Sequence, residues 1–325
     1  MAENQFDKYV VSKPLYASGA GYKGRQSPAM TLLSRQQVPE AHTYIELAWI
    51  TGKPQSNPHS GEQVHDFDEI MIYWGKDSAK PQVLGGEIEI YIGGQPITFN
   101  TTAGIYIPKG TPHGPMTWKK FERPHLEMLM VLGTGDPLKE WGTKGTKKPS
   151  VKRDFDYEQY VVRSPLRESP GAISGQGRQS PTMTYMSETQ IQGVKTYLEF
   201  GWIHKITDTI REMKHDNFEE IVLHIGNDPA NPEDLGADMT FGLGGGEKRF
   251  NTNYAMFIPR GMAHGPLIWH EVRRHHIEMA IMLGAGTLKE GWGFDIGDMT
   301  RARAAIARGE KIPLIQRNPP EPPKK

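Results

Sequence analysis

The chain has 325 residues, which suggests about two domains of ordinary size. Its 38 basic and 38 acidic residues cancel, and no apolar run approaches the ~18–20 residues that span a bilayer. Because there is no cysteine, disulfides, thiolate ligands and a Cys nucleophile are excluded, which leaves His, Asp and Glu to hold any metal. We expect a soluble, cytoplasmic protein that binds neither nucleic acid nor membrane.

In chain order, short segments of the first half return in the second half. The phrase IPKGTPHGPMTW at 107–118 returns as IPRGMAHGPLIW at 258–269, an interval of 151 residues (258 − 107). Three further pairs are YVV at 9–11 and 160–162, GRQSPAMT at 24–31 and GRQSPTMT at 177–184, and TYIELAWI at 43–50 and TYLEFGWI at 196–203. Since the order is kept and the interval far exceeds a solenoid unit of roughly 20–50 residues, this is a duplicated domain.

The hydrophobic pattern within each copy has a period of two, which is typical of strands. In the first copy the predicted strands are YIELAWI (44–50), EIMIYWG (69–75), EIEIYIGG (87–94), AGIYIPKG (103–110) and HLEMLMVLG (125–133). No long amphipathic helix appears, and 36 glycines and 25 prolines make turns frequent. The pattern therefore predicts an antiparallel sandwich or barrel for each copy.

The domain boundaries follow from the repeat and from composition. We expect an N-terminal domain over 1–143 and a C-terminal domain over 157–297. The basic stretch KGTKKPSVKRDFD, with its Pro and Gly, predicts an exposed linker over 144–156. Residues 298–325 begin with an Ala- and Arg-rich stretch and end in a Pro-rich one, which predicts a short helix and a tail.

Two histidines and one glutamate stand at matching places in both copies. In HDFDE, alternation puts His65 and Glu69 on one face, and His113 follows in the turn-rich phrase. The second copy has the corresponding set His215, Glu220 and His264. A lone histidine is more often structural, but the conjunction in two diverged copies indicates a divalent metal site. Two imidazoles and a carboxylate leave coordination positions open; the set suits non-haem iron, and Mn or Zn also fit.

These segments resemble the two motifs of the cupin superfamily, and the duplication resembles a bicupin. The first motif is H-x-H, three or four residues, then Glu; the chain has QVHDFDEIMIYWG (63–75) and MKHDNFEEIVLHIG (213–226). The second motif, P-x-G-x-x-H, is matched by PKGTPH (108–113) and PRGMAH (259–264). The resemblance implies an all-β protein of two tandem cupin-like barrels (double-stranded β-helix or jelly roll), each with a metal near one mouth.

Both copies depart from the first motif at its first histidine. Gln63 stands there in one copy and Met213 in the other. An amide oxygen of Gln63 suits a hard metal, whereas a thioether does not. Alternative fourth ligands are His59, His125 and His276. For His125, a hydrogen bond to Glu127 that supports the barrel is favoured over ligation.

The repeated GRQSP segment offers one arginine in each copy. Arg25 and Arg178 either anchor an anionic substrate or tie a loop to backbone carbonyls.

The expected function is that of a metal-dependent enzyme acting on a small enolic, keto or aromatic molecule. One candidate is a non-haem iron dioxygenase that cleaves a C–C bond, for which Fe is the expected metal. The alternatives are a redox-neutral isomerase or hydrolase, with Glu127, Tyr73 or His224 as catalytic group, and a non-enzymatic ligand-binding bicupin. The partner is a small-molecule substrate, and exposed strand edges favour a homodimer. The differences between Gln63 and Met213 and between Tyr73 and His224 predict that the two pockets do unequal work.

Overall fold

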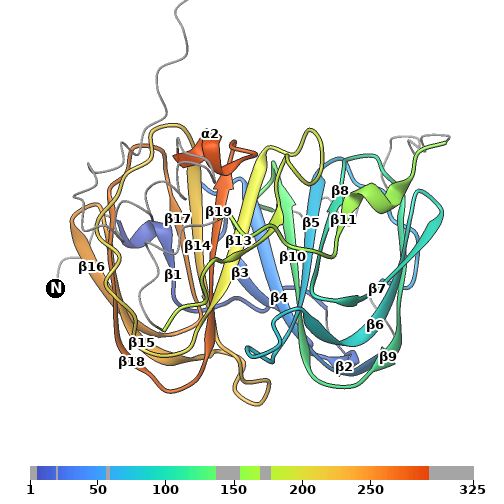
Figure 1. Ribbon diagram of the computed structural model, residues 1–325, viewed down its shortest axis with the longest axis horizontal. Coiled ribbons are helices and arrows are strands. Elements are labelled where there is room, and N and C mark those ends of the chain that lie inside the picture. Colours follow the sequence, from blue (N-terminus) through green and yellow to red (C-terminus); the bar gives the residue numbers. More distant parts are fainter. Residues whose placement is uncertain (1–5, 20, 56–58, 137–153, 169–176, 293–325) are drawn as a thin grey trace, which may run out of the picture. The chain divides into compact units, whose positions relative to one another are not determined.

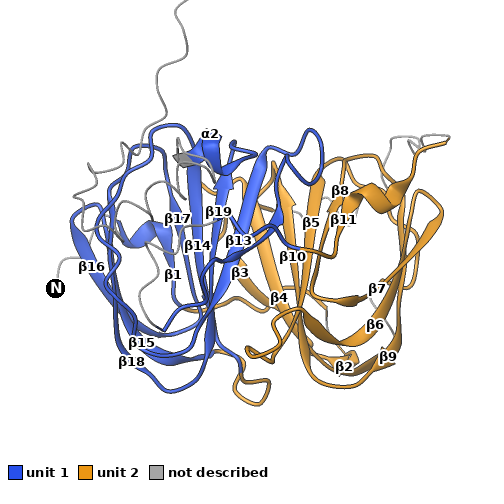
Figure 2. Cartoon of the chain, viewed as in Figure 1, with its two compact units in different colours: residues 1–12, 165–227, 234–325 blue, residues 13–164, 228–233 orange. Residues whose placement is uncertain are grey.

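A computed structural model describes residues 6–19, 21–55, 59–136, 154–168 and 177–292. Most of the predicted linker, and the whole predicted helix and tail at 298–325, lie outside these residues. The regular structure is almost entirely antiparallel strand, in two compact units (Figures 1 and 2). The predicted all-β fold is therefore confirmed. In the part of the chain that the structure describes, no helix is both long and apolar enough to cross a membrane.

Unit 2 comprises Lys13–Ser164 and Asp228–Glu233 and is built on two sheets. The larger sheet has the order β11-β8-β5-β10-β4-β2, with β3 also on β4, and the smaller has the order β7-β6-β9. The elements are β2 (Lys23–Arg25), β3 (Met30–Leu33), β4 (Thr43–Gln55), β5 (Asp68–Gly75), β6 (Val83–Ile92), β7 (Gln95–Thr101), β8 (Ala103–Ile107), β9 (His113–Phe121), β10 (His125–Leu132), the 3-10 helix η2 (Tyr157–Tyr160) and β11 (Val161–Val162).

Unit 1 comprises Met1–Ser12, Pro165–Asn227 and Asp234–Lys325 and repeats this plan. Its larger sheet has the order β1-β17-β14-β19-β13-β12 and its smaller sheet β16-β15-β18. The elements are η1 (Asp7–Tyr9), β1 (Val10–Val11), β12 (Met183–Met186), β13 (Thr196–Ile203), β14 (Glu219–Ile225), β15 (Asp234–Leu243), β16 (Gly246–Thr252), β17 (Tyr254–Ile258), β18 (His264–Val272), β19 (His276–Leu283) and helix α2 (Leu288–Trp292).

The burial of the central strands explains their composition. Strand β10 lies between β5 and β4 and is buried at every position but its last, so its sequence HLEMLMVL is apolar apart from His125 and Glu127. Strand β7 instead alternates between exposed and buried positions, because one of its faces meets solvent. The apolar cores include Trp49 and Trp74 in unit 2 and Trp202 in unit 1, all fully buried.

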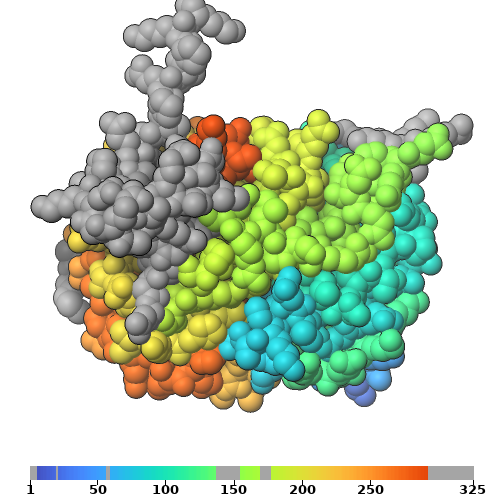
Figure 3. Space-filling model, viewed as in Figure 1, coloured from blue at the N-terminus to red at the C-terminus, as the bar shows by residue number. Residues whose placement is uncertain are grey.

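The ends of the two repeats are exchanged. Strand β1 pairs with β17, with Val10 opposite Met256, so the first residues of the chain complete a sheet of unit 1. Strand β11 pairs with β8, with Val161 opposite Ile105, and completes a sheet of unit 2. In Figure 3, lime-green residues that follow the first repeat in the sequence lie beside turquoise residues of unit 2. The compact units thus differ from the expected domains because each short YVV strand pairs with the edge strand of the other repeat.

Candidate metal centres

Three side chains converge in unit 2. His65 comes from the loop before β5, Glu69 from β5 and His113 from the first position of β9. His113 Nε2 lies 3.0 Å from Glu69 Oε2, and His65 Nε2 lies 3.8 Å from Glu69 Oε1. One ligand atom of each residue lies within 4.8 Å of the others. We call these residues the unit 2 metal group.

The Pro-x-Gly phrase explains how two distant histidines are brought together. Thr111 N–H donates to Pro108 O and closes a turn. Gly110 in this turn has φ +77°, a backbone conformation that residues other than Gly rarely adopt. Gly110 N–H in turn donates to His65 O at 2.7 Å, so the turn fixes the backbone that carries the first ligand. His113 then follows from the same turn, which is why the phrase is kept in both copies.

Gln63 lies beside this group. Its backbone exchanges two hydrogen bonds with His113, and its Oε1 lies 3.2 Å from His65 Nε2. The side chain therefore presents an amide oxygen where a fourth donor is needed. In unit 1, Met213 makes the same backbone pair with His264 but offers only a thioether.

The same arrangement occurs in unit 1. Glu220 on β14 has its Oε2 3.0 Å from His264 Nε2 and 3.4 Å from His215 Nε2. Gly261 N–H donates to His215 O at 2.6 Å from the corresponding turn. These three side chains, which we call the unit 1 metal group, are all buried. Among the described residues, the unit 1 and unit 2 metal groups are the clusters of three or more His, Asp or Glu side chains that could hold a metal ion.

The charge state of both groups fits a divalent cation. Burial alone would raise the pKa of Glu69, but His113 and His65 outweigh it and the pKa is lowered. For Glu220, burial is likewise outweighed by His215 and His264, and the pKa falls to about 2. Neither Glu69 Oε2 nor Glu220 Oε2 accepts a hydrogen bond of normal geometry from the described residues, although an imidazole nitrogen is 3.0 Å away. A buried, ionised carboxylate oxygen together with two imidazole nitrogens matches the donor atoms of a divalent metal site.

Behind the unit 2 metal group lies a buried ion network. Glu127 on β10 is 3 % exposed and accepts hydrogen bonds from Arg25 Nη2 at 2.9 Å and Arg25 Nε at 3.2 Å. His59 Nε2 lies 3.2 Å from the same Oε1 atom. Burial would raise the pKa of Glu127, but Arg25 and His59 lower it to about 2. Arg25 thus pairs with a carboxylate of its own chain, and its Nη1 also donates to the backbone carbonyl of Gln26 at 3.4 Å, one of the two partners that its motif suggested.

Unit 1 has only part of this network. Arg178 Nη2 lies 3.0 Å from Glu278 Oε1, as Arg25 does from Glu127. Ile210 stands at the position of His59, because Leu267 N–H donates to Ile210 O as Met116 N–H donates to His59 O, both at 2.8 Å. Burial and the charge of Glu220 raise the pKa of Glu278 against the opposing effect of Arg178. Equivalent carboxyls therefore have pKa shifts of opposite direction.

Tyr73 and His224 occupy equivalent positions, and both are fully buried. The hydroxyl of Tyr73 lies 3.1 Å from Met116 Sδ, and burial raises its pKa well above the ordinary value. Burial, together with His276 and Arg178, lowers the pKa of His224 well below its ordinary value. Within the described residues, neither ring nitrogen of His224 has a hydrogen-bond partner. The two barrels thus differ in their interior chemistry.

Two of the alternative fourth ligands, His125 and His276, make their contacts outside the metal groups, whereas the third, His59, lines the cavity at the unit 2 metal group. His125 accepts a hydrogen bond from Trp118 Nε1 at 3.0 Å, and its Nδ1 lies 3.0 Å from Arg123 O. His276 accepts from Trp269 Nε1 at 3.3 Å in the same way. The residue paired with Glu127 is His59 instead of the expected His125. Separation in sequence hides this contact, because the two residues are 68 positions apart.

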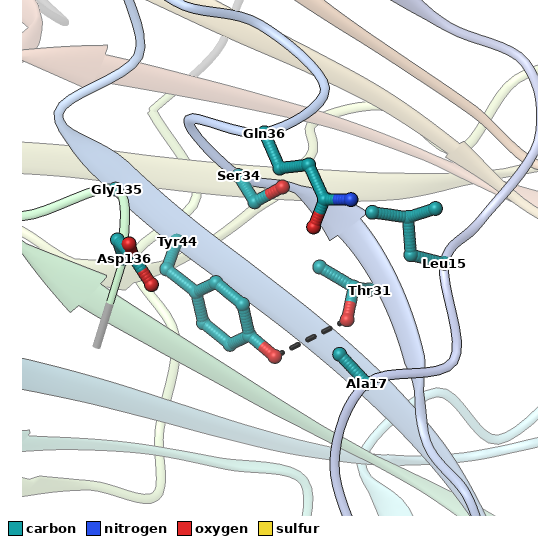
Figure 4. A pocket seen from close by; sticks show the side chains of 8 residues that line it. All are labelled: Leu15, Ala17, Thr31, Ser34, Gln36, Tyr44, Gly135 and Asp136. Carbon is teal, nitrogen blue, oxygen red and sulfur yellow. Dashed lines mark hydrogen bonds between the residues drawn. The ribbon is translucent and has the colours of Figure 1, made fainter. Parts of the chain in front are cut away.

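Two cavities open in unit 2. A small one of about 10 Å³ lies at the metal group, and its lining includes His59, Gln63, Met71, His113 and Met116. The second, of about 70 Å³, is lined by Leu15, Ala17, Thr31, Ser34, Gln36, Tyr44, Gly135 and Asp136 (Figure 4). Tyr44 OH faces this cavity beside Thr31 and donates to Glu46, which lies 3.6 Å from Arg25. A chain of polar contacts therefore runs from the second cavity to Glu127.

Comparisons with known proteins identify the fold. No family model and no curated protein sequence matches the chain. Among solved structures, one of oxalate decarboxylase superposes with a TM-score of 0.55 at 11% identity, over 87% of this chain and 79% of that one. A structure of oxalate decarboxylase from Bacillus subtilis gives 0.52 at 11% identity, over 87% and 78%. AerE from Microcystis aeruginosa gives 0.48 at 11% identity, over 83% and 96%.

The fold and the motifs together define a class. The chain has the fold of a duplicated cupin, a bicupin, as the motif resemblance implied. The low sequence identity restricts the likeness to the fold.

Proposed function

We propose that the protein is a metal-dependent enzyme whose substrate is a small keto or enolic acid held at the unit 2 metal group. The observation that carries this is the convergence of His65, Glu69 and His113 on one point, with the oxygen of Gln63 beside them. A bound divalent cation supplies Lewis-acid stabilisation of negative charge on a carbonyl or enolate oxygen. Three protein ligands leave positions at which such an oxygen can bind.

Charge favours an anionic chelating substrate. A divalent cation with one carboxylate ligand leaves a net charge of +1 in a buried cavity, and a bidentate monoanion neutralises it. The charge of Arg25 does not add to the charge of the metal group, because the carboxylates of Glu127 and Glu46 lie next to Arg25 and offset it. The apolar methionines of the cavity, Met71 and Met116, suit a short carbon chain.

Two reaction types remain within this proposal. With Fe(II), open positions for substrate and O₂ support oxygen-dependent C–C cleavage; with Mn, Zn or Fe, the same chelate supports redox-neutral proton transfer. The similarity to oxalate decarboxylase supports a bicupin fold for either chemistry.

Metal analysis tests the proposal. The full chain is purified with and without air, its metal content is measured by mass spectrometry, and oxygen uptake is recorded with a panel of 2-oxo acids and 1,3-diketones. We expect up to two divalent ions per chain, and a lower thermal midpoint after chelation, because an ion that binds only the folded state stabilises it by about 2.7 kcal/mol at a concentration 100-fold above Kd. A chain without metal, and with the same midpoint after chelation, would instead be a non-enzymatic scaffold.

A further inference from the structure

One histidine outside the unit 2 metal group lines the same cavity. His59 shares this cavity with Gln63 and His113, and its side chain is 20 % exposed. Backbone contacts hold its segment, since Met116 N–H donates to His59 O at 2.8 Å. His59 is therefore fixed beside the metal group and still reaches solvent.

A fixed sequence of contacts orients this imidazole. Arg25 holds Glu127 with two hydrogen bonds, and the same Oε1 atom lies 3.2 Å from His59 Nε2. A carboxylate that accepts from one imidazole nitrogen sets the tautomer, directs the other nitrogen and stabilises the imidazolium ion once the ring takes up a proton. Because Arg25 and His59 both favour its ionised form, Glu127 is poorly suited to take up the proton itself.

We propose that His59 is the proton-transfer residue of unit 2, and that Glu127 and Arg25 are positioning residues that hold it. This inference rests on the proposed function. The imidazole takes a proton from the carbon next to the carbonyl of a small 2-oxo acid. The C–H electron pair becomes the C=C bond of the enolate, and the carbonyl π pair moves to the oxygen. The proton is then returned to carbon or exchanged with solvent, so no oxidant or reductant is required.

The second repeat provides an internal comparison. Ile210 stands at the position of His59, since Leu267 N–H donates to Ile210 O as Met116 N–H does to His59 O, and an alkyl side chain cannot take up a proton. Arg178 and Glu278 are nevertheless retained at 3.0 Å. The positioning pair is thus present in both units, whereas the residue that it positions is present only in unit 2. Proton transfer is accordingly a property of unit 2, and unit 1 binds its ion without this step.

Deuterium incorporation tests the assignment. The metal-loaded full chain is incubated in D₂O with pyruvate or 2-oxobutyrate, and deuterium at C3 is measured by mass spectrometry. His59→Gln, which keeps a hydrogen-bond donor toward Glu127, is expected to slow exchange by roughly 10²–10⁴-fold. Ile210→Ala is the matched control and should exchange at the rate of the unsubstituted chain. Added imidazole should partly restore exchange in His59→Ala.

Two further measurements separate the roles. Metal content should stay at the unsubstituted level in His59→Gln, because His59 is not a ligand. Glu127→Gln should lower kcat more than it changes KM, with partial recovery in Glu127→Asp, as expected for a residue that acts through His59. If His59→Gln exchanges at the unsubstituted rate, or loses metal, this inference is overturned while the proposed function stands. If the unsubstituted, metal-loaded chain exchanges neither acid, this inference is overturned; the proposed function is overturned only if the chain also holds no metal and takes up no oxygen with the substrate panel.

Discussion

Replacement of Arg25 by methionine tests the buried ion network of unit 2 directly. The substitution keeps most of the apolar stem but removes the cation that donates two hydrogen bonds to Glu127. Glu127 remains buried, and His59 alone opposes the effect of burial on its pKa. A buried carboxylate that loses its cation is strongly destabilising, because its desolvation is no longer offset.

The magnitude follows from the pKa of Glu127. It lies at about 2 instead of 4.5, and a difference of 2.5 units at 1.36 kcal/mol per unit corresponds to about 3 kcal/mol. Arg25 is the larger of the two lowering influences, so we expect Arg25→Met to cost about 2–3 kcal/mol at pH 7 from this pair alone. The pKa of Glu127 is depressed in the folded chain, so its contribution is present above pH 4.5 and is lost as the pH falls toward 2. At pH 3 the cost should shrink to about 1.4 kcal/mol or less.

The assay is urea unfolding of the chelator-treated full chain, followed by circular dichroism at pH 7 and pH 3. Arg249→Met is the control, because Arg249 forms an exposed ion pair with Asp238 and should change stability little. The double variant Arg25→Met/Glu127→Gln should recover much of the loss, since it leaves Glu127 without a charge. An Arg25→Met variant as stable as the control at both pH values, or a double variant no more stable than the single one, would refute this account of the network.

Three further predictions follow from the sites. His113→Ala and His264→Ala should each remove about one metal equivalent, measured by mass spectrometry, but only His113→Ala should abolish turnover; equal partial losses of activity would indicate two equivalent sites. Gly114→Ala should destabilise unit 2 by about 2 kcal/mol or more and lower its metal affinity in a metal titration, because Gly114 has φ +86° and an added Cβ would lie 2.4 Å from Gly61 O. Gly193→Ala, at the same φ of +86° but with open space around its Cβ, separates the conformational cost from the clash; an equal loss of stability in both variants would contradict the role of the clash. Glu278→Gln and Glu127→Gln should change the free energy of unfolding with opposite pH dependences in urea unfolding. The pKa of Glu278 is raised, so its stabilising contribution is lost as the pH rises above 4.5, and Glu278→Gln becomes less destabilising with rising pH. The pKa of Glu127 is lowered, so Glu127→Gln becomes more destabilising between about pH 2 and 4.5. Parallel pH dependences would contradict the opposite pKa shifts, namely the lowering at Glu127 by Arg25 and His59 and the raising at Glu278 by burial and Glu220.

The strands and the metal groups could be predicted from the sequence because both leave local patterns. Alternation marks the strands, and a turn of fixed length places His113 beside His65. The partners of Glu127 could not be predicted, because Arg25 and His59 approach it from other strands and loops at long sequence separation. The exchange of the YVV strands was hidden for a similar reason, since two-residue strands carry too little pattern to identify their partner.

Helix α2 was missed although a local signal exists. Thr287-Leu-Lys-Glu290 has the pattern of a capping box, and Thr287 Oγ1 accepts from Glu290 N–H at 3.1 Å. The apolar periodicity of so short a segment is too weak to predict a helix, so the cap is the sequence feature that indicates it.

The pairing of β1 with β17 has a consequence for synthesis on the ribosome. Val10 is made 246 residues before its partner Met256 (256 − 10). At about 5–20 residues per second, the first segment therefore waits on the order of 12–50 s for the strand that it pairs with. Strand β11, by contrast, emerges after the rest of its sheet in unit 2 has been made, and can close it at once. The larger sheet of unit 2 can thus be completed as soon as β11 is made, whereas the larger sheet of unit 1 must wait for β17 to meet β1, which exposes the edge of β1 to chaperones or to neighbouring chains in the interval.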